Sequence, residues 1–271
     1  MAEATGRTFR MLWPRTPHCG ATFQELFCNA WPVEDVSEQS MADLPFAHPR
    51  SGGPPDLLAA ADEDVVLGGV LVRPDLYPSH AKLAASKLAY WGQLQPVAAI
   101  DAVIRDFRAR HFRPTMIGVH LRRGDFATYD PDAFENTSAA LAATTEAMQR
   151  FPDANIFLAS DDGAPNPNGS STAAQRVREL FAHRFGDRVV WTTPRSLERG
   201  STEAVQDGLV DLWLLRQTDY FIGTTKSGFS HLVIYGHNVP NVFCNGGASA
   251  SRQVRWLTKI TGYVAKQKWR R

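Results

Sequence analysis

Hydrophobic positions in the second half of the chain recur in two alternating patterns. Short apolar runs typical of strands occupy residues 115–122, 155–160, 188–192, 220–223 and 241–244. Between them, apolar residues recur at helical spacing over 138–150, 172–185, 203–217 and 229–236. Strands that alternate with helices favour a parallel sheet joined by right-handed crossovers. We therefore predict a regular α/β domain here.

The first part of the chain has weaker strand patterns. It contains two strand candidates, 9–13 and 65–72, and a loop rich in Pro, Ser and Gly over 35–56. Helical patterns occupy residues 21–30, 79–92 and 97–111. We predict a small N-terminal α/β domain at 1–111 and a larger domain at 112–250. A helix and basic tail at 251–271 are expected to pack back on the N-terminal domain.

Composition and charge exclude several classes of protein. The 271 residues are 44% hydrophobic and carry a net charge of +1, which gives no bulk attraction to nucleic acid or a membrane surface. Cys19, Cys28 and Cys244 lack paired metal spacing and are expected to be small buried hydrophobes. The sequence shows neither a membrane-spanning run nor the apolar core of a signal peptide, so we expect a cytoplasmic location.

One stretch of the sequence combines a strand pattern with candidate chemistry. Residues 116–125 read M-I-G-V-H-L-R-R-G-D. Because side chains of an extended chain alternate between faces, His120 and Arg122 share one face. Ligands of α/β proteins gather beyond the carboxyl ends of strands, where an arginine offers phosphate a planar fork of donors. The stretch predicts either a phosphate-binding arginine or a surface strand end with solvated arginines.

The loop after the strand at 220–223 is rich in hydroxyl groups and reads T-T-K-S-G-F-S over 224–230. Backbone N–H groups at a helix start form an anion site, to which hydroxyls add donors. The loop lacks both the Walker A pattern and G-x-G-x-x-G. It predicts either a phosphate site or a well-capped helix, formed by Thr224, Thr225, Ser227 and Gly228.

The helical pattern at 203–217 carries Asp207 and Asp211, one turn apart on a shared face. Asp211 lies in the apolar sequence V-D-L-W-L-L, where a carboxylate needs a partner. Its two oxygens suit the N1 and N2 edge of guanine, although an acid on the exposed side of the helix has the same pattern. The apolar positions of the helix should face the core: Val205, Leu209, Leu212 and Trp213.

Asp161 and Asp162 follow the strand pattern at 155–160. Two adjacent acids without a completing cluster make a poor metal site, so a helix cap or a nucleotide contact is favoured. No Cys or His pair has zinc spacing, and no G-x-S-x-G elbow presents a nucleophile. We predict neither a metal nor a cofactor.

Three of these stretches together resemble the α1,6- and protein O-fucosyltransferase superfamily. They are G-V-H-L-R-R-G-D, F-L-A-S-D-D and D-L-W-L-L-R-Q-T-D-Y-F-I-G-T-T-K-S-G-F-S, in this order. The bacterial nodulation-type α1,6-fucosyltransferases are the most similar group, and the run R-M-L-W-P-R-T-P-H-C-G-A-T-F-Q-E-L-F resembles their start. The resemblance implies a GT-B-like fold of two Rossmann-like domains with parallel sheets, the C-terminal one more regular. It also implies inverting, metal-independent transfer from GDP-fucose.

The resemblance gives roles to individual positions. Arg122 matches the arginine that grips the donor diphosphate, and His120 matches the histidine beside the nucleotide. Asp211 matches the acid that reads guanine. Ser227 and Gly228 match phosphate-loop positions, although this chain has T-T-K-S-G there in place of the T-F-S-S-Q type.

Two further acids have less defined roles. Asp162 falls in the second motif, near the base or ribose. Asp130 lies ten positions after the motif histidine, where the α1,6 subgroup has a glutamate, and is the candidate base for the acceptor. Some relatives manage without a protein base. The resemblance implies that the acceptor is a hydroxyl of a glycan or a protein and that the domain at 1–111 lies on the acceptor side. Two alternatives stay open: transfer from another nucleotide-sugar, or a nucleotide-binding module without turnover.

Overall fold

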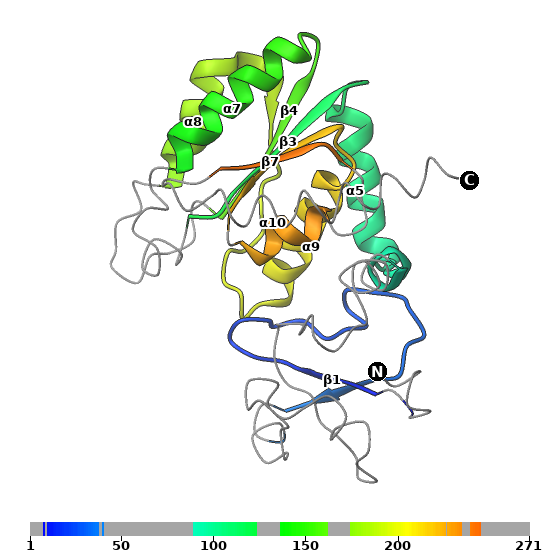
Figure 1. Ribbon diagram of the computed structural model, residues 1–271. Coiled ribbons are helices and arrows are strands. Elements are labelled where there is room, and N and C mark those ends of the chain that lie inside the picture. The colour runs from blue at the N-terminus through cyan, green and yellow to red at the C-terminus, as the bar shows by residue number, and fades with distance from the viewer. Residues whose placement is uncertain are drawn as a thin grey trace, which may run out of the picture.

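The main body of the protein is a five-stranded parallel sheet with the strand order β5-β4-β3-β6-β7 (Figure 1). The computed structural model describes residues 8, 10–37, 40, 89–123, 136–161, 174–225, 227–234 and 239–244. The strands are β3 (Met116–Leu121), β4 (Asn155–Ser160), β5 (Val189–Val190), β6 (Tyr220–Thr224) and β7 (Asn241–Cys244). All four neighbouring pairs are parallel, which confirms the predicted sheet.

Helices cover both faces of the sheet. The helices are α5 (Ala98–His111), α7 (Asn136–Arg150), α8 (Ala174–Phe185), α9 (Thr202–Leu215) and α10 (Gly228–Ile234), and a short 3-10 helix η4 (Gly186–Arg188) precedes β5. Helices α7 and α8 pack on one face, while α5, α9 and α10 pack on the other (Figure 1). The four predicted helices that lie between strands are therefore confirmed within a few residues at each end.

Two cores follow from the alternation of side chains along β3. Ile117, Val119 and Leu121 belong to the core under α7 and α8, whereas Met116 belongs to the core under α5 and α9. The predicted apolar face of α9 is confirmed, because its residues are buried in the core under α5 and α9 or packed against it: Val205, Leu209, Leu212 and Trp213.

The direction in which the chain adds strands to the sheet reverses between β3 and β6. The chain runs outward from β3 through β4 to β5, then crosses back to β6 beside β3 and continues to β7. In open α/β sheets such a topological switch point leaves a crevice beyond the strand ends, where ligands bind. The carboxyl ends of β3 and β6 are therefore the place where the fold favours a ligand.

The described N-terminal residues hold a separate two-stranded parallel sheet, β1 (Met11–Pro14) with β2 (Val33–Val36). Residues 89–93 are helical, and α5 packs on the main body through a contact between the rings of Phe107 and Phe157 at 5.6 Å. The predicted strand at 65–72 and the predicted tail at 251–271 lie outside the described residues. The domain boundaries at 111 and 250 stay predictions.

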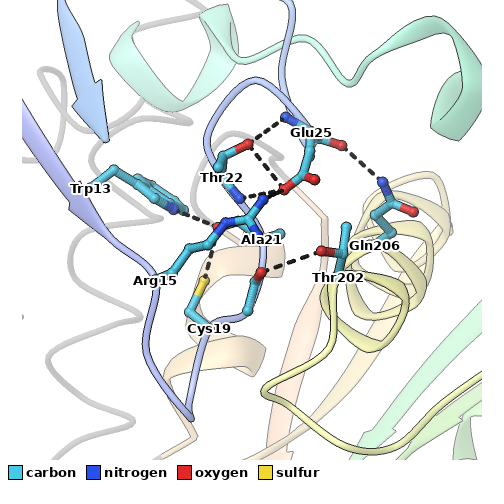
Figure 2. A network of polar contacts seen from close by, with 9 residues as sticks. Trp13, Arg15, Cys19, Ala21, Thr22, Glu25, Thr202 and Gln206 are labelled. Carbon is cyan, nitrogen blue, oxygen red and sulfur yellow. Dashed lines mark hydrogen bonds and ion pairs between the residues drawn. The ribbon is translucent and has the colours of Figure 1, made fainter. Parts of the chain in front are cut away.

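The helix predicted over 21–30 is wrong, because these residues form a turn and then an extended segment. Thr22 Oγ1 accepts from the Glu25 N–H at 3.2 Å, and the Glu25 carboxylate accepts from the Thr22 N–H at 2.7 Å (Figure 2). This is a capping box, the usual start of a helix. The chain leaves the turn because Cys28 N–H and Leu26 C=O instead bond to residues 95 and 97.

The same turn fastens the N-terminal region to α9 (Figure 2). Gln206 Nε2 donates to the carbonyl of Glu25 at 3.0 Å, and Thr202 Oγ1 donates to the carbonyl of Gly20 at 3.3 Å. A Cβ atom at Gly20 would lie 2.0 Å from the carbonyl oxygen of Gly200, so only glycine permits this close approach. The N-terminal region is thus held on the helix that carries Asp211.

Candidate functional site

The hydroxyl of Thr224 joins the ends of β3 and β6 at the topological switch point. Its Oγ1 donates to the carbonyl of His120 at 2.9 Å and accepts from the Arg122 N–H at 3.0 Å. Thr224 is fully buried, so both bonds are shielded from water. These bonds fix the backbone on either side of Leu121 and determine where the Arg122 side chain begins.

The guanidinium of Arg122 is held by Asp161. Its Nη1 lies 2.5 Å from Asp161 Oδ2, and both side chains are only 20% exposed. The pairing of Leu121 with Ser160 in adjacent strands brings the next residues, Arg122 and Asp161, side by side. Charge-assisted bonds of this length orient a guanidinium firmly.

Asp161 also holds the backbone of Arg123, since its Oδ1 accepts from the Arg123 N–H at 2.6 Å. The side chain of Arg123 bonds instead to Thr137 on α7, toward the opposite face. The side chains of Arg122 and Arg123 therefore have different partners, Asp161 and Thr137. Sequence reasoning placed Asp162 near the base or ribose and did not identify Asp161 as the partner of Arg122. The available signal was the place of Asp161 directly after the strand pattern.

His120 is an interior residue, 5% exposed, and its ring stacks on Phe229 of α10 at 4.6 Å between centroids. Its Nδ1 lies 2.6 Å from the hydroxyl oxygen of Ser230. Burial, reinforced by the charge of Arg122, lowers the pKa of His120 to about 3. His120 is therefore a neutral residue that joins β3 to α10.

The hydroxyl groups of the loop at 224–230 form hydrogen bonds with other groups of the protein. Thr225 Oγ1 donates to the carbonyl of Cys244 at 3.1 Å, and the Thr224 N–H donates to Ser230 Oγ at 3.0 Å. Ser227 Oγ accepts from the Ser230 N–H at 3.4 Å, as in a capped helix start. Gly228, the first residue of α10, is exposed. The hydroxyl protons of both threonines are therefore committed to backbone carbonyls, which favours the capped-helix interpretation for their side chains.

Asp211 lies apart from this cluster, on α9. It is half-buried, and its Oδ1 accepts from Thr192 Oγ1 at 2.6 Å. Burial raises the pKa of Asp211 to about 7, against the lowering effects of the Thr192 bond and the charge of Arg178; Asp207 raises it further.

The switch-point cluster brings together six of the predicted site residues: His120, Arg122, Thr224, Thr225, Ser227 and Gly228. Asp211 instead bonds to Thr192, which follows β5, and β5 lies two strands from β3, roughly 10 Å at the usual strand spacing. Asp130 and Asp162 lie outside the described residues. The roles given to all these residues stay predictions.

The described part of the chain gathers no group of three or more His, Cys, Asp or Glu side chains suited to a metal ion. None of the helices in this part has the length and apolar character that a membrane crossing needs.

Comparisons with known proteins find fucosyltransferases, the group that the motifs resemble. No family model matches the sequence. The GDP-fucose protein O-fucosyltransferase 2 of Drosophila melanogaster is 27% identical over 147 residues, 51% of this chain and 28% of that protein. The chain therefore spans well under half the length of this curated relative.

Two solved structures are similar over most of their length. Fucosyltransferase NodZ from Bradyrhizobium superposes with a TM-score of 0.54 and 20% identity, covering 86% of this chain and 83% of that one. NodZ α-1,6-fucosyltransferase soaked with GDP-fucose gives a TM-score of 0.49 and 18% identity over 88% and 85% of the two chains. The first of these superpositions shows a shared fold.

Proposed function

We propose that this chain, which has the GT-B fold of the fucosyltransferase superfamily as its motifs predicted, transfers fucose from GDP-fucose to a hydroxyl of a glycan or protein. The observation that carries the proposal is the arginine at the switch point. Arg122 lies at the carboxyl end of β3 and is oriented by Asp161 and anchored by Thr224. The Drosophila relative, whose name specifies GDP-fucose, supports the choice of donor.

The donor diphosphate would lie at Arg122, with its base toward Asp211. A guanidinium matches two phosphate oxygens, and an ionised carboxylate matches the N1–H and N2–H donors of guanine. Arg122 follows β3, and Thr192, the partner of Asp211, follows β5; these two strands are roughly 10 Å apart at the usual strand spacing. A nucleoside diphosphate, whose base and β-phosphate lie at opposite ends, suits such a separation. The first-turn backbone of α10, at Gly228, is the part of the loop that we expect to meet phosphate.

The proposed reaction is an inverting displacement without a metal, as the resemblance implies. Fucose leaves as an oxocarbenium-like species while negative charge develops on the β-phosphate of GDP. Arg122 is already oriented before the substrate arrives, so it stabilises this charge without reorganising. The acceptor hydroxyl loses its proton to Asp130 or to a base outside the protein, and Asp130 lies outside the described residues.

A transfer assay tests the activity. The full chain is incubated with GDP-fucose and a panel of sugars, glycosides and Ser/Thr peptides, and the products are weighed by mass spectrometry. The proposal expects the mass of one deoxyhexose added to at least one acceptor. Addition of another sugar from a mixed donor panel, with none from GDP-fucose, would contradict it.

Calorimetry tests donor recognition without knowledge of the acceptor. GDP binding that is tighter than UDP or CMP binding, and unchanged by EDTA, is the expected result. Loss of GDP binding in EDTA would contradict metal independence. Preference for UDP or CMP would favour another nucleotide-sugar as donor. Absence of binding for every nucleotide would contradict the proposed donor site.

A further inference from the structure

The segment between β5 and α9 is fastened to two acids of α9. Thr192 donates to Asp211 at 2.6 Å, and the Arg195 N–H donates to Asp207 Oδ2 at 2.6 Å. Arg195 Nε also donates to Asp207 Oδ1 at 2.9 Å. Because the acids lie one helical turn apart, residues 192–195 run alongside α9. Among the described residues, Asp207 thus accepts from the charged side chain of Arg195, whereas Asp211 accepts from the neutral hydroxyl of Thr192.

We propose that Thr192 is a positioning residue for the base-reading carboxylate of Asp211. This inference rests on the proposed function, in which Asp211 reads guanine. A carboxylate has about four acceptor positions, and Thr192 occupies one of them. The remaining positions accommodate N1–H and N2–H of the base. The short bond from Thr192 fixes the side-chain torsion, so the carboxylate plane is set before the nucleotide binds.

The bond also favours the protonation state that guanine requires. A protonated Asp211 would present an O–H donor to the N1–H donor of guanine, and the two would repel. The charged groups that act on Asp211 come from two helices: Arg178 of α8 favours the ionised carboxylate, whereas Asp207 of α9 opposes it. Burial opposes it most strongly. Thr192 counters burial through a hydrogen bond to the charged form.

The test compares nucleotides that differ at the edge read by Asp211. Dissociation constants for GDP, IDP and UDP are measured by calorimetry at pH values on both sides of the Asp211 pKa. IDP lacks the 2-amino group of guanine, and UDP lacks the purine. The variants are Thr192→Val, which keeps the shape without the hydroxyl, and Thr192→Ser, which restores it. Thr193→Val is the matched control, because Thr193 is the exposed neighbour.

In Thr192→Val we expect GDP to bind about tenfold more weakly, the effect of losing one hydrogen bond to a charged group. UDP binding should not change. The preference for GDP over IDP should fall, and the pH at which GDP binding is half-maximal should rise. Thr192→Ser should regain both properties, and Thr193→Val should match the wild type. If Thr192→Val does not fold, Thr192→Ala gives the same readout without added bulk.

The inference is overturned if Thr192→Val, or Thr192→Ala in its place, keeps the wild-type GDP-to-IDP preference and pH midpoint. Parallel weakening of GDP and UDP would equally overturn it, since Thr192 would then act through general structure. Failure of the proposed function is a separate result that appears before any variant is made. In that case the wild-type protein binds GDP no better than UDP.

Discussion

The two ends of the proposed donor site are built differently. At the phosphate end, Arg122 is fixed by a short ion pair to Asp161, and Thr224 anchors its backbone between two strands. At the base end, Asp211 accepts a hydrogen bond from Thr192, which lies in an irregular segment. The phosphate end is thus preorganised for charge stabilisation. We propose that the base end controls nucleotide choice and responds to pH, so each end should be open to a separate perturbation.

Replacing Arg122 by Ala should cause the largest loss of transfer rate, and it should affect the phosphate end alone. Removing a preorganised donor of developing charge typically lowers the rate by about 100- to 1,000-fold. The fold should survive, because the backbone bond to Thr224 does not need the side chain. Transfer or donor-hydrolysis rates and a circular dichroism melt measure the two effects. Rates equal to wild type would remove Arg122 from the mechanism.

Asp161→Asn should weaken the phosphate end through loss of orientation. The variant removes the negative charge that pairs with Arg122 and leaves a neutral amide oxygen as acceptor, and hydrogen bonds to charged groups contribute roughly 1.5–3 kcal/mol. We expect a rate loss of about 10- to 150-fold, smaller than that of Arg122→Ala. GDP selectivity over UDP should stay unchanged, which calorimetry on both nucleotides measures. A change in selectivity would mean that the two ends are coupled.

Thr224→Val should reveal how far the anchor between the strands stabilises the protein. The isosteric change leaves the Arg122 N–H and the His120 carbonyl without their hydroxyl partner. An unsatisfied buried group costs about 1–3 kcal/mol of unfolding free energy. Urea denaturation measures the loss, with Thr224→Ser as the control that keeps the hydroxyl. Equal stability of the two variants would show that the hydroxyl is dispensable.

The pH dependence of GDP binding should report on Asp211, at the base end, separately from the phosphate end. Asp211 has a raised pKa of about 7, so its ionised fraction falls as the pH drops below that value. GDP binding should weaken by at most about tenfold for each further pH unit. His120, whose pKa is about 3, stays neutral over this range and adds no step. UDP carries the same diphosphate and serves as the control, and a parallel fall for both nucleotides would assign the step elsewhere.

The regular part of the fold was predictable because burial imposes a strong pattern. The strands at 155–160 and 241–244 match β4 and β7. The apolar face of α9 follows the helical repeat, because the helix must bury one side. The N-terminal turn was not predictable, because its capping box is the same local signal that starts a helix. Only the tertiary bonds to residues 95 and 97 decide that the chain turns away.

The site was predictable in its residue types and only partly in its contacts. The motif arginine follows its strand as expected, and its position at the switch point follows from the sheet order. Sequence reasoning named Asp162 as a site residue and left Asp161 out, because only the strand register shows that Asp161 lies beside Arg122. Thr192 went unnoticed for a similar reason. A pair of threonines before a proline has the pattern of an ordinary loop, and only the packing on α9 reveals its bond to Asp211.

A crystal structure of the protein with GDP tests the central claim most directly. The account predicts that one GDP molecule spans the two ends. A guanidinium nitrogen of Arg122 should lie within about 3.2 Å of a β-phosphate oxygen, and Asp211 should lie equally close to N1 or N2 of guanine. A diphosphate bound away from the switch point, or a base turned away from Asp211, would contradict it.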